Sequence, residues 1–310
     1  MYKINVLIVT YKQAGVIGRN IESILQQKEY GLNKIVICDD HSPDNNWEVI
    51  QQYVKKYPDY IEAYHNESNL GIYGNSNKLI TLRGKADFYC WLEGDDALCD
   101  GFFKKAQEFI VDNKIDSSNA VGIFSGYKKI TPEGKEIDNN NDYLSQHPKR
   151  NPFGAYSRGF MSWRSGLYSS SVLDRFHEVD TSMGLSLAEY TFDSQWFLHI
   201  DEAFYMPYIS SIYYSGIGVS TFIYGGEYDK SEAYTQYTYY LENNAITVFD
   251  RFWGKCHIIR ADYCSNPHNS IFKKIWGIIS FSFDFLVGSL PYGINWGLYF
   301  SYLSAMIKKL

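Results

Sequence analysis

The segment Phe88-Tyr89-Cys90-Trp91-Leu92-Glu93-Gly94-Asp95-Asp96 is an apolar run that ends in three carboxylates around a glycine. This pattern predicts a buried strand that presents acidic side chains at its carboxyl end, where open α/β sheets place their ligands. Carboxylates this close repel one another unless a cation lies among them. We therefore expect a divalent metal site. The alternative is an ordinary turn, in which Gly and Asp are common residues.

Three strands are predicted before this segment, each followed by polar residues: apolar runs at 4–9 and 34–38, and a third strand at about 61–65. Apolar residues recur at helical spacing over 16–27 and 46–57. A further helix, ending near residue 83, is expected after a polar loop at 69–77. Strands that alternate with helices predict an α/β fold with a mostly parallel central sheet flanked by helices.

Polar residues follow each predicted strand, in the pairs Thr10-Tyr11 and Asp39-Asp40, in the loop 69–77 and in the acidic turn 93–96. Because parallel strands align their carboxyl ends, these segments are expected to converge on one nucleotide pocket. Local explanations stay open, since Asp44 or Asn45 could cap a helix and residues 69–71 could form a simple turn.

The chain lacks the glycine-rich phosphate loops of other nucleotide-binding proteins. No Gly-x-x-x-x-Gly-Lys-Ser/Thr and no Gly-x-Gly-x-x-Gly follows the first strand, which disfavours a P-loop ATPase or a standard dinucleotide dehydrogenase. A diphosphate would then be handled chiefly by a metal. The carboxylates at 93–96 suit Mg²⁺ or Mn²⁺, which prefer oxygen ligands and leave positions open for phosphate oxygens.

Four motifs occur in a fixed order: Val-Thr-Tyr-Lys at 9–12, Ile-Cys-Asp-Asp-His-Ser-Pro-Asp at 37–44, Asn-Leu-Gly at 69–71 with Asn77, and Leu-Glu-Gly-Asp-Asp at 92–96. The ordered set resembles family 2 glycosyltransferases over about residues 3–125. The resemblance implies the GT-A fold, a nucleotide-diphosphate sugar as donor, and inversion at the anomeric carbon.

The resemblance also assigns donor residues. Thr10, Tyr11 and Asp40 would contact the nucleotide base, and Asp39 would support their loop. Related enzymes often carry Arg just before the equivalent of Asn77, but this chain has Ser76 there, which removes an expected diphosphate contact.

Further donor contacts follow from the same resemblance. Gly71 would shape the donor pocket together with Asn77. Asp95 and Asp96 would hold the metal, whereas Glu93 stands where many relatives have Asp and would touch the ribose. The segment 212–220 lacks the Arg and His that relatives often place near the diphosphate.

The acceptor side is expected in the second half of the chain. Trp163 and Arg164 are candidate acceptor contacts, with ordinary packing as the alternative. Asp193 stands at the start of a predicted helix, where it could simply interact with helix amides. The resemblance makes it the general base, with Glu189 in reserve. Residues 137–152 are expected to form a mobile surface loop, with a functional lid as the alternative.

These assignments divide the chain into a GT-A catalytic domain, 1–220, and an aromatic-rich, mainly helical region, 221–310. The catalytic domain comprises a donor half, 1–125, and an acceptor half, 126–220. Within 271–310, two amphipathic helices are expected either to lie on a membrane face or to pack against the core.

Composition limits the partners. The formal charge is 29 − 35 = −6 and no basic stripe is present, so no nucleic-acid partner is expected. Five cysteines without a Cys-x-x-Cys pair, and an N-terminus without a signal-peptide pattern, predict a cytoplasmic site of action, with the inner face of the cell membrane as an extension of it.

The favoured function is a metal-dependent hexosyltransferase that moves a sugar from a nucleotide-diphosphate donor, with UDP-sugar preferred, to an acceptor hydroxyl of a surface glycan or lipid-linked saccharide. A sugar nucleotidyltransferase is one rival, although it would need a basic phosphate loop after the first strand. The other rival is a carbohydrate-binding or scaffold protein without catalysis.

Overall fold

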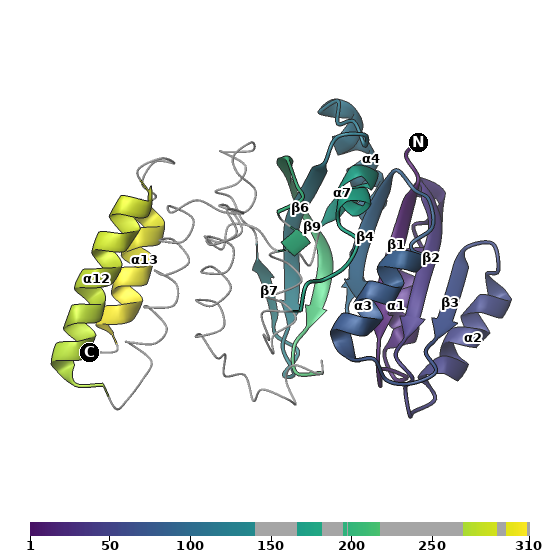
Figure 1. The fold of residues 1–310 in the computed structure, drawn as a ribbon, viewed down its shortest axis with the longest axis horizontal. Coiled ribbons are helices and arrows are strands. Elements are labelled where there is room, and N and C mark those ends of the chain that lie inside the picture. Colours follow the sequence, from purple (N-terminus) through teal and green to yellow (C-terminus); the bar gives the residue numbers. More distant parts are fainter. Residues whose placement is uncertain (140–165, 182–194, 197, 218–268, 290–295, 309–310) are drawn as a thin grey trace. The chain divides into compact units, whose positions relative to one another are not determined.

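The computed structural model describes residues 1–139, 166–181, 195–196, 198–217, 269–289 and 296–308. The chain divides into two compact units. Among the described residues, the first unit contains a nine-stranded sheet with helices α1 to α4 and α7, and the second contains α12 and α13 (Figure 1). The α/β class predicted from the sequence is confirmed.

The first four strands form the parallel part of the sheet: β1 (Ile4–Thr10), β2 (Leu32–Asp39), β3 (Ile61–His65) and β4 (Phe88–Glu93), in the order β3-β2-β1-β4. All seven residues of β1 are buried, because the strand has a neighbour on each side and helices on both faces. The central strands therefore contain long apolar runs, whereas β3, at the edge of the sheet, has only Ile61 buried. All four strands were correctly predicted from the sequence.

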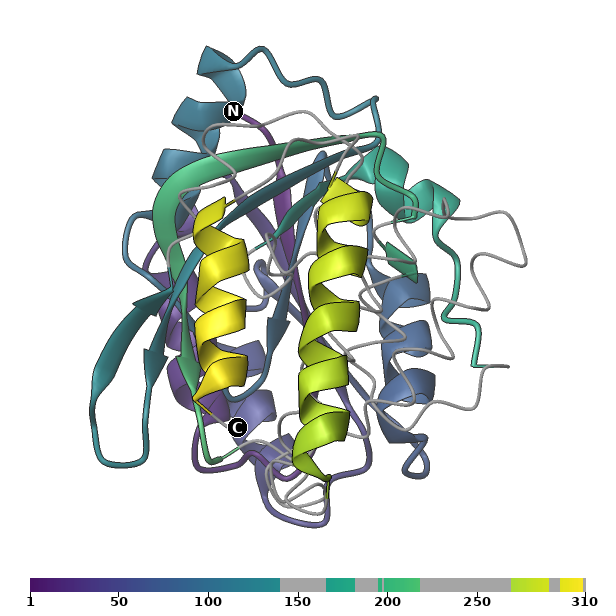
Figure 2. The same cartoon turned by 90° about the vertical axis from the view of Figure 1, so that its left-hand side faces the viewer.

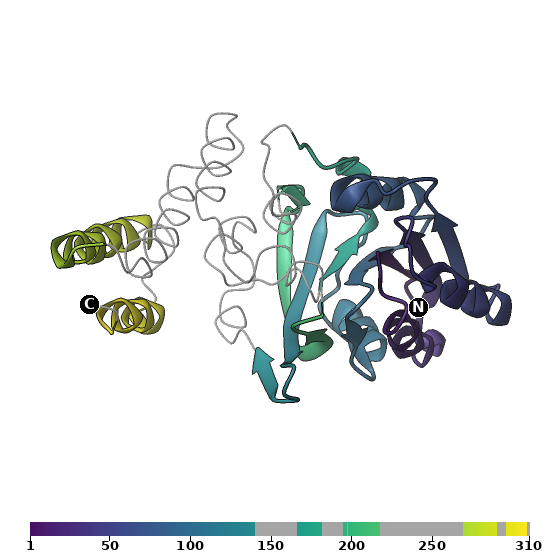
Figure 3. The same ribbon diagram turned by 90° about the horizontal axis from the view of Figure 1, so that it is seen from below.

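Helices cover both faces of this parallel part (Figure 3). Buried residues of α1 (Ile17–Leu25), α2 (Asn46–Lys56) and α4 (Phe102–Asp112) join one hydrophobic cluster with alternate residues of β1. Helix α3 (Gly71–Leu82) packs on the opposite face, against β1 and β2. Alternation along β1 thus supplies both faces of the sheet with apolar side chains.

The beginning of α3 was wrongly predicted. The helix begins at Gly71, so most of the expected loop 69–77 is helical. Two glycines and two asparagines in its first seven residues lower its intrinsic helix propensity. Tertiary contacts override that preference, since the buried amide of Asn75 donates to the Cys38 carbonyl at 3.0 Å and accepts from Asn66 at 3.0 Å.

The sheet continues beyond β4 in the order β8-β6-β9-β5, with β7 paired to β6. These strands are β5 (Ala97–Leu98), β6 (Val121–Ile130), β7 (Glu136–Asn139), β8 (Leu167–Ser169) and β9 (Glu202–Tyr214). β6 and β9 are parallel, and the other pairings in this part are antiparallel, so the sheet as a whole is mixed. The predicted loop 137–152 is corrected at its start, where β7 pairs with β6; residues 140–152 lie outside the described residues.

The second unit contributes two described helices, α12 (Ile271–Ser289) and α13 (Trp296–Ile307), which lie side by side (Figure 2). The Tyr299 ring packs against Phe281 and Phe285, with ring centroids 6.2 Å and 5.3 Å apart, and its hydroxyl donates to Ser282 Oγ at 3.0 Å. The expected helical C-terminal extension is therefore present. Among the described residues, no helix combines the length and apolar character needed to cross a bilayer.

A partly buried histidine predicts how the stability of the first unit depends on pH. Burial, together with the positive charges of Arg175 and His177, lowers the pKa of His199 below its ordinary 6.5. Below about pH 6.5, His199 therefore binds a proton more readily in the unfolded chain than in the folded protein. The free energy of unfolding is consequently highest above about pH 6.5 and decreases as the pH falls below that value. We expect His199→Gln to reduce the change in urea midpoint between pH 7.5 and about pH 5.5. An equal change in both proteins would contradict this.

Candidate active site

The structure brings the predicted donor segments to one edge of the sheet. In the strand register, Thr10 lies opposite Asp39, Asp39 lies opposite His65, and Val9 lies opposite Glu93. The polar segments that follow these strands therefore begin at the same level of the sheet. This edge is where parallel α/β sheets form their ligand crevices.

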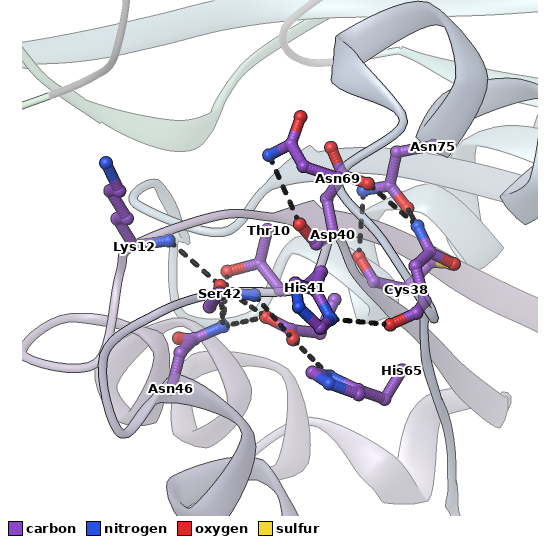
Figure 4. A network of polar contacts seen from close by, with 12 residues as sticks. Thr10, Lys12, Cys38, Asp40, His41, Ser42, Asn46, His65, Asn69 and Asn75 are labelled. Carbon is purple, nitrogen blue, oxygen red and sulfur yellow. Dashed lines mark hydrogen bonds and ion pairs between the residues drawn. The ribbon is translucent and has the colours of Figure 1, made fainter.

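Asp39 is fully buried and accepts hydrogen bonds from the side chains of Ser42, Asn46 and His65, which are labelled in Figure 4. Its Oδ1 accepts from the Ser42 hydroxyl at 2.5 Å and from Asn46 Nδ2 at 2.6 Å, while its Oδ2 lies 2.6 Å from His65 Nδ1. The Ser42 backbone N–H also donates to Oδ2, at 3.2 Å. With its lone pairs used in this way, Asp39 fits the supporting role expected of it.

Asp40 is also buried, but only one of its oxygens has described partners. Oδ1 accepts from Asn66 Nδ2 and from the Leu70 backbone N–H, each at 2.8 Å. The Asp40 N–H donates to the Thr10 carbonyl at 3.0 Å, and Asn69 Nδ2 donates to the Asp40 carbonyl at 3.3 Å. These contacts tie the ends of β1, β2 and β3 to the start of α3 and fix the orientation of the carboxylate.

The loop after β1 is held by the same network. Thr10 Oγ1 accepts from Asn46 Nδ2 at 3.1 Å, and the Lys12 N–H donates to Ser42 Oγ at 3.0 Å. Lys12 and His41 both have positive φ, 57° and 56°, which is uncommon for residues with a Cβ. Such strain persists where the surroundings determine the backbone, and it is concentrated at functional sites.

The acidic turn after β4 is held through its backbone. Asn20 Nδ2 donates to the carbonyls of Glu93 at 2.7 Å and Asp96 at 3.0 Å, and the Arg19 guanidinium donates to the Asp95 carbonyl at 2.7 Å. Arg19 and Asn20, both in α1, therefore hold the turn through its backbone carbonyls and not through its carboxylates. Asp95 and Asp96 are themselves largely buried.

Strand β9 also contributes to this turn. The Arg19 guanidinium stacks on the ring of Tyr214, 3.5 Å from the centroid, and the Tyr214 N–H lies 3.4 Å from Asp96 Oδ1. Arg19 therefore places a cation beside the acidic turn.

Gly94 makes the turn compact, and an added methyl group is expected to disrupt it. A Cβ at this position would overlap Gln13 Oε1 and lie 3.0 Å from Thr10 Cβ. Gln13 Oε1 is the end of a flexible side chain and can shift, but Thr10 Cβ and Oγ1, both 3.0 Å away, belong to a buried residue of β1. We expect Gly94→Ala to lower the free energy of unfolding by about 1–3 kcal/mol, the usual cost of overpacking. Gly15→Ala is the matched control, because nothing lies within 4 Å of its Cβ. Equal urea midpoints for the two variants would contradict the prediction.

The remaining predicted residues are not all brought to this edge. Gly71 begins α3 with φ 72° and has no atom within 4 Å of an added Cβ. Asn77 lies in α3, and its Oδ1 accepts from the Val179 N–H at 2.8 Å. The predicted Trp163, Arg164, Glu189 and Asp193 lie outside the described residues.

Several site residues were missed from the sequence: Arg19, Asn20, Asn46, His65 and Asn66. His65 and Asn66 end and follow β3, so the rule used for the other strands could have found them. Asn20 is a fully buried polar residue among the apolar positions of α1, which is itself an indication of a specific partner.

Among the residues that the structure describes, the acidic turn supplies the carboxylates expected to bind a metal. Within the described ranges, no group of three His, Cys, Asp or Glu side chains is arranged to hold a metal ion. Asp95 and Asp96 supply hard oxygen donors of the type that Mg²⁺ and Mn²⁺ prefer. Mg²⁺ is usually bound through one or two carboxylates together with substrate phosphates, so a pair of aspartates fits such an ion.

Comparisons with known proteins agree with this geometry. A processive diacylglycerol beta-glycosyltransferase of Mycoplasma pneumoniae is 26% identical over 168 residues, covering 46% of this chain and 49% of that protein. The chain thus spans about half the length of this relative. Staphylococcus aureus TarS 1–349 in complex with UDP shares the fold, with a TM-score of 0.61 at 13% identity, over 99% of this chain and 88% of TarS 1–349.

A Pyrobaculum calidifontis mannosyltransferase, in complex with GDP-Man and Mn²⁺, has a TM-score of 0.56 at 10% identity, over 99% of this chain and 86% of its own. At these identities the two structures establish a common fold. The model of the family described as Glycosyl transferase family 2 matches residues 5–176, which is more than half of the chain and includes the polar edge of the sheet and its acidic turn. The chain therefore belongs to glycosyl transferase family 2.

Proposed function

We propose that this chain transfers a sugar, with inversion, from a UDP-sugar to an acceptor hydroxyl of a lipid-linked or surface saccharide. The observation that carries the proposal is the polar edge of the sheet, where Asp39 and Asp40 are oriented by a buried network beside the acidic turn. The complexes of TarS with UDP and with UDP-GlcNAc support a uridine nucleotide.

The hydrogen bonds that the Asp40 carboxylate already accepts favour uracil over guanine as the base of the donor. A carboxylate can accept through both oxygens, but Asp40 Oδ1 already accepts from Asn66 and Leu70. The remaining oxygen would accept the single imide N–H of uracil. Guanine presents two adjacent donors, which a carboxylate pairs best when both of its oxygens are available. Thr10 and Tyr11, at the end of β1, would complete the contacts with the base.

Asp95 and Asp96 would hold Mg²⁺ or Mn²⁺, and the Mn²⁺ complex of the mannosyltransferase supports a divalent ion. When bound, the metal stabilises the negative charge of the departing diphosphate. Glu93 would contact the ribose. Its Oε1 accepts from Trp91 Nε1 at 3.2 Å, which orients the carboxylate from within β4. Gly71 and Asn77 of α3 would bound the donor pocket.

Asp193 would act as the general base that removes the proton of the acceptor hydroxyl, with Glu189 as the alternative. Trp196, three residues later in the sequence, is buried and packs edge-on against Trp91 of β4 with ring centroids 5.4 Å apart.

The acceptor would contact Trp163 and Arg164 and would be lipid-linked or part of a surface glycan. The diacylglycerol acceptor in the name of the Mycoplasma relative supports a lipid-linked molecule. A cytoplasmic site of action is proposed with it. Burial raises the pKa of Cys38 and Cys90 to about 12 and that of Cys99 to about 11, so these three free thiols are expected to stay protonated and unreactive.

Thermal unfolding with UDP, GDP, CMP or dTDP, each with Mn²⁺ or EDTA, tests the donor assignment. At a ligand concentration near 100 Kd, binding stabilises the native state by about 2.7 kcal/mol, which raises Tm by roughly 5–10 °C. We expect this shift for UDP with Mn²⁺ and a smaller one with EDTA. Asp95→Asn should remove the difference between Mn²⁺ and EDTA. No shift with any nucleotide would reject the donor pocket.

Product analysis then separates the enzyme classes. Transfer to an acceptor, or slow hydrolysis of the UDP-sugar, is the result expected of a glycosyltransferase. Release of pyrophosphate from UTP and a sugar phosphate would instead establish a sugar nucleotidyltransferase. UDP binding without any turnover across a panel of acceptors would favour a carbohydrate-binding protein.

A further inference from the structure

Helix α12 is apolar on two opposite faces. At 100° per residue, Gly277, Phe281 and Phe285 lie on one stripe, and all three are buried. Phe272, Trp276, Ile279 and Phe283 occupy an arc of the other face, and each is exposed, with Phe272 at 81% and Trp276 at 64%. A surface helix normally has a polar outer face. The outer face of α12 therefore has the composition of a contact surface.

Helix α13 repeats this arrangement. Met306 is buried, and Tyr299 packs against the inward rings of α12. Trp296 and Phe300 are exposed, one turn apart, with their rings stacked at 6.0 Å. The two neighbouring helices thus each carry exposed aromatic residues along much of their length. Monomeric proteins rarely expose apolar surface of this extent unless it is a site of interaction.

The charge of this region indicates the occupant. Residues 269–310 contain four lysines and one aspartate, whereas the whole chain has a net charge of −6. Tyr299, near the start of α13, packs against Phe281 and Phe285 in the second half of α12, so the two helices are antiparallel. Lys273, in the first turn of α12, and Lys308, just after α13, are both exposed and therefore lie at the same end of the helix pair. Exposed aromatic residues together with lysines are typical of helices that lie in the interface of an anionic bilayer, with the rings in the headgroup layer.

We propose that the exposed faces of α12 and α13 form a docking surface for an anionic lipid bilayer. The apolar stripe extends along α12 from its first turn to Phe283, so the helix would lie parallel to the membrane with the outer aromatic residues inserted. The lysines at one end of the helix pair would contact lipid phosphates. Docking of this kind requires only unit two, and it would occur with or without sugar transfer.

Flotation of the full chain with vesicles tests the surface. The vesicles contain phosphatidylcholine alone or with about one third phosphatidylglycerol, since each lysine near an anionic surface contributes roughly fivefold in affinity. We expect flotation with the anionic vesicles. Phe272→Ser with Trp276→Ser, and separately Trp296→Ser with Phe300→Ser, should each weaken binding at least about tenfold. Lys273→Gln with Lys308→Gln should weaken binding to the anionic vesicles alone.

Matched controls come from α4 in the first unit. Val111→Ser removes an apolar side chain that is 63% exposed, and Lys104→Gln removes an exposed lysine; neither should change flotation. A wild-type protein that floats with neither vesicle would overturn the proposal, as would equal flotation of wild type and the Phe272 and Trp276 variant. Light scattering that shows a dimer, dissociated by that variant, would assign the face to a second copy instead.

Discussion

Replacement of Asp193 by Asn is expected to reduce the kcat of sugar transfer by about 10²–10⁴-fold, the usual contribution of a general base. The carboxamide keeps the size of the side chain but cannot take the proton of the acceptor hydroxyl. Donor binding does not involve that proton, so the affinity for UDP with Mn²⁺ should change by no more than about twofold. Single-turnover transfer from the UDP-sugar measures the first quantity, and calorimetric titration with UDP measures the second.

Glu189→Gln is the matched control for this experiment, because it makes the same chemical change four residues earlier. It should retain most of the transfer rate. A large loss in Glu189→Gln, with transfer preserved in Asp193→Asn, would move the role of base to Glu189. A fall in the Tm of either variant would show that its loss of transfer reflects damage to the fold.

Replacement of Asp39 by Ala is expected to lower the free energy of unfolding by about 3–5 kcal/mol, the cost of breaking a buried charged network. Donors from Ser42, Asn46 and His65 would lose their shared acceptor in a fully buried position. Of these donors, Asn46 is itself buried, and leaving it unsatisfied costs about 1–3 kcal/mol, whereas the half-buried Ser42 and the exposed His65 can bond to water. Urea unfolding measures the loss, and UDP binding should fall with it, because this network orients the neighbouring loop.

Asp44→Ala provides the comparison, since Asp44 is an exposed residue of the same loop that accepts one described bond, from the Ala14 N–H at 3.2 Å. Asp44→Ala should lower the free energy of unfolding by about 1 kcal/mol or less. Similar urea midpoints for Asp39→Ala and Asp44→Ala would show that the buried network does not stabilise the sheet edge.

The parallel part of the fold was predictable because several signals agreed locally. The strand that ends in Asp39 is a continuous apolar run, and it is followed by polar residues and an amphipathic helix. Helix α3 was misjudged at its start because its glycines and asparagines indicate a loop. Its stability depends on Asn75, whose partners Cys38 and Asn66 are remote in the sequence. Propensity cannot report such contacts.

The candidate site was predictable to a similar extent. Thr10, Asp39, Asp40 and the acidic turn stand at or directly after the ends of strands, so the topology of the sheet brings them to one edge. The residues that hold the acidic turn could not be predicted in this way. Asn20 and Arg19 reach it from a helix more than seventy positions earlier, and Tyr214 reaches it from a strand more than a hundred positions later. Pairing across such distances has no periodic signal in a single sequence.

The contacts of Tyr214 with Arg19 and Asp96 limit which segments of the chain can be exchanged with those of another family member. Exchange of the segment after residue 125 for that of another family member would replace β9 and with it one support of the acidic turn. Donor and acceptor specificities are then not freely recombinable modules. Productive chimeras should need their crossover points after Tyr214, or the transplanted strand should bring an aromatic partner for Arg19.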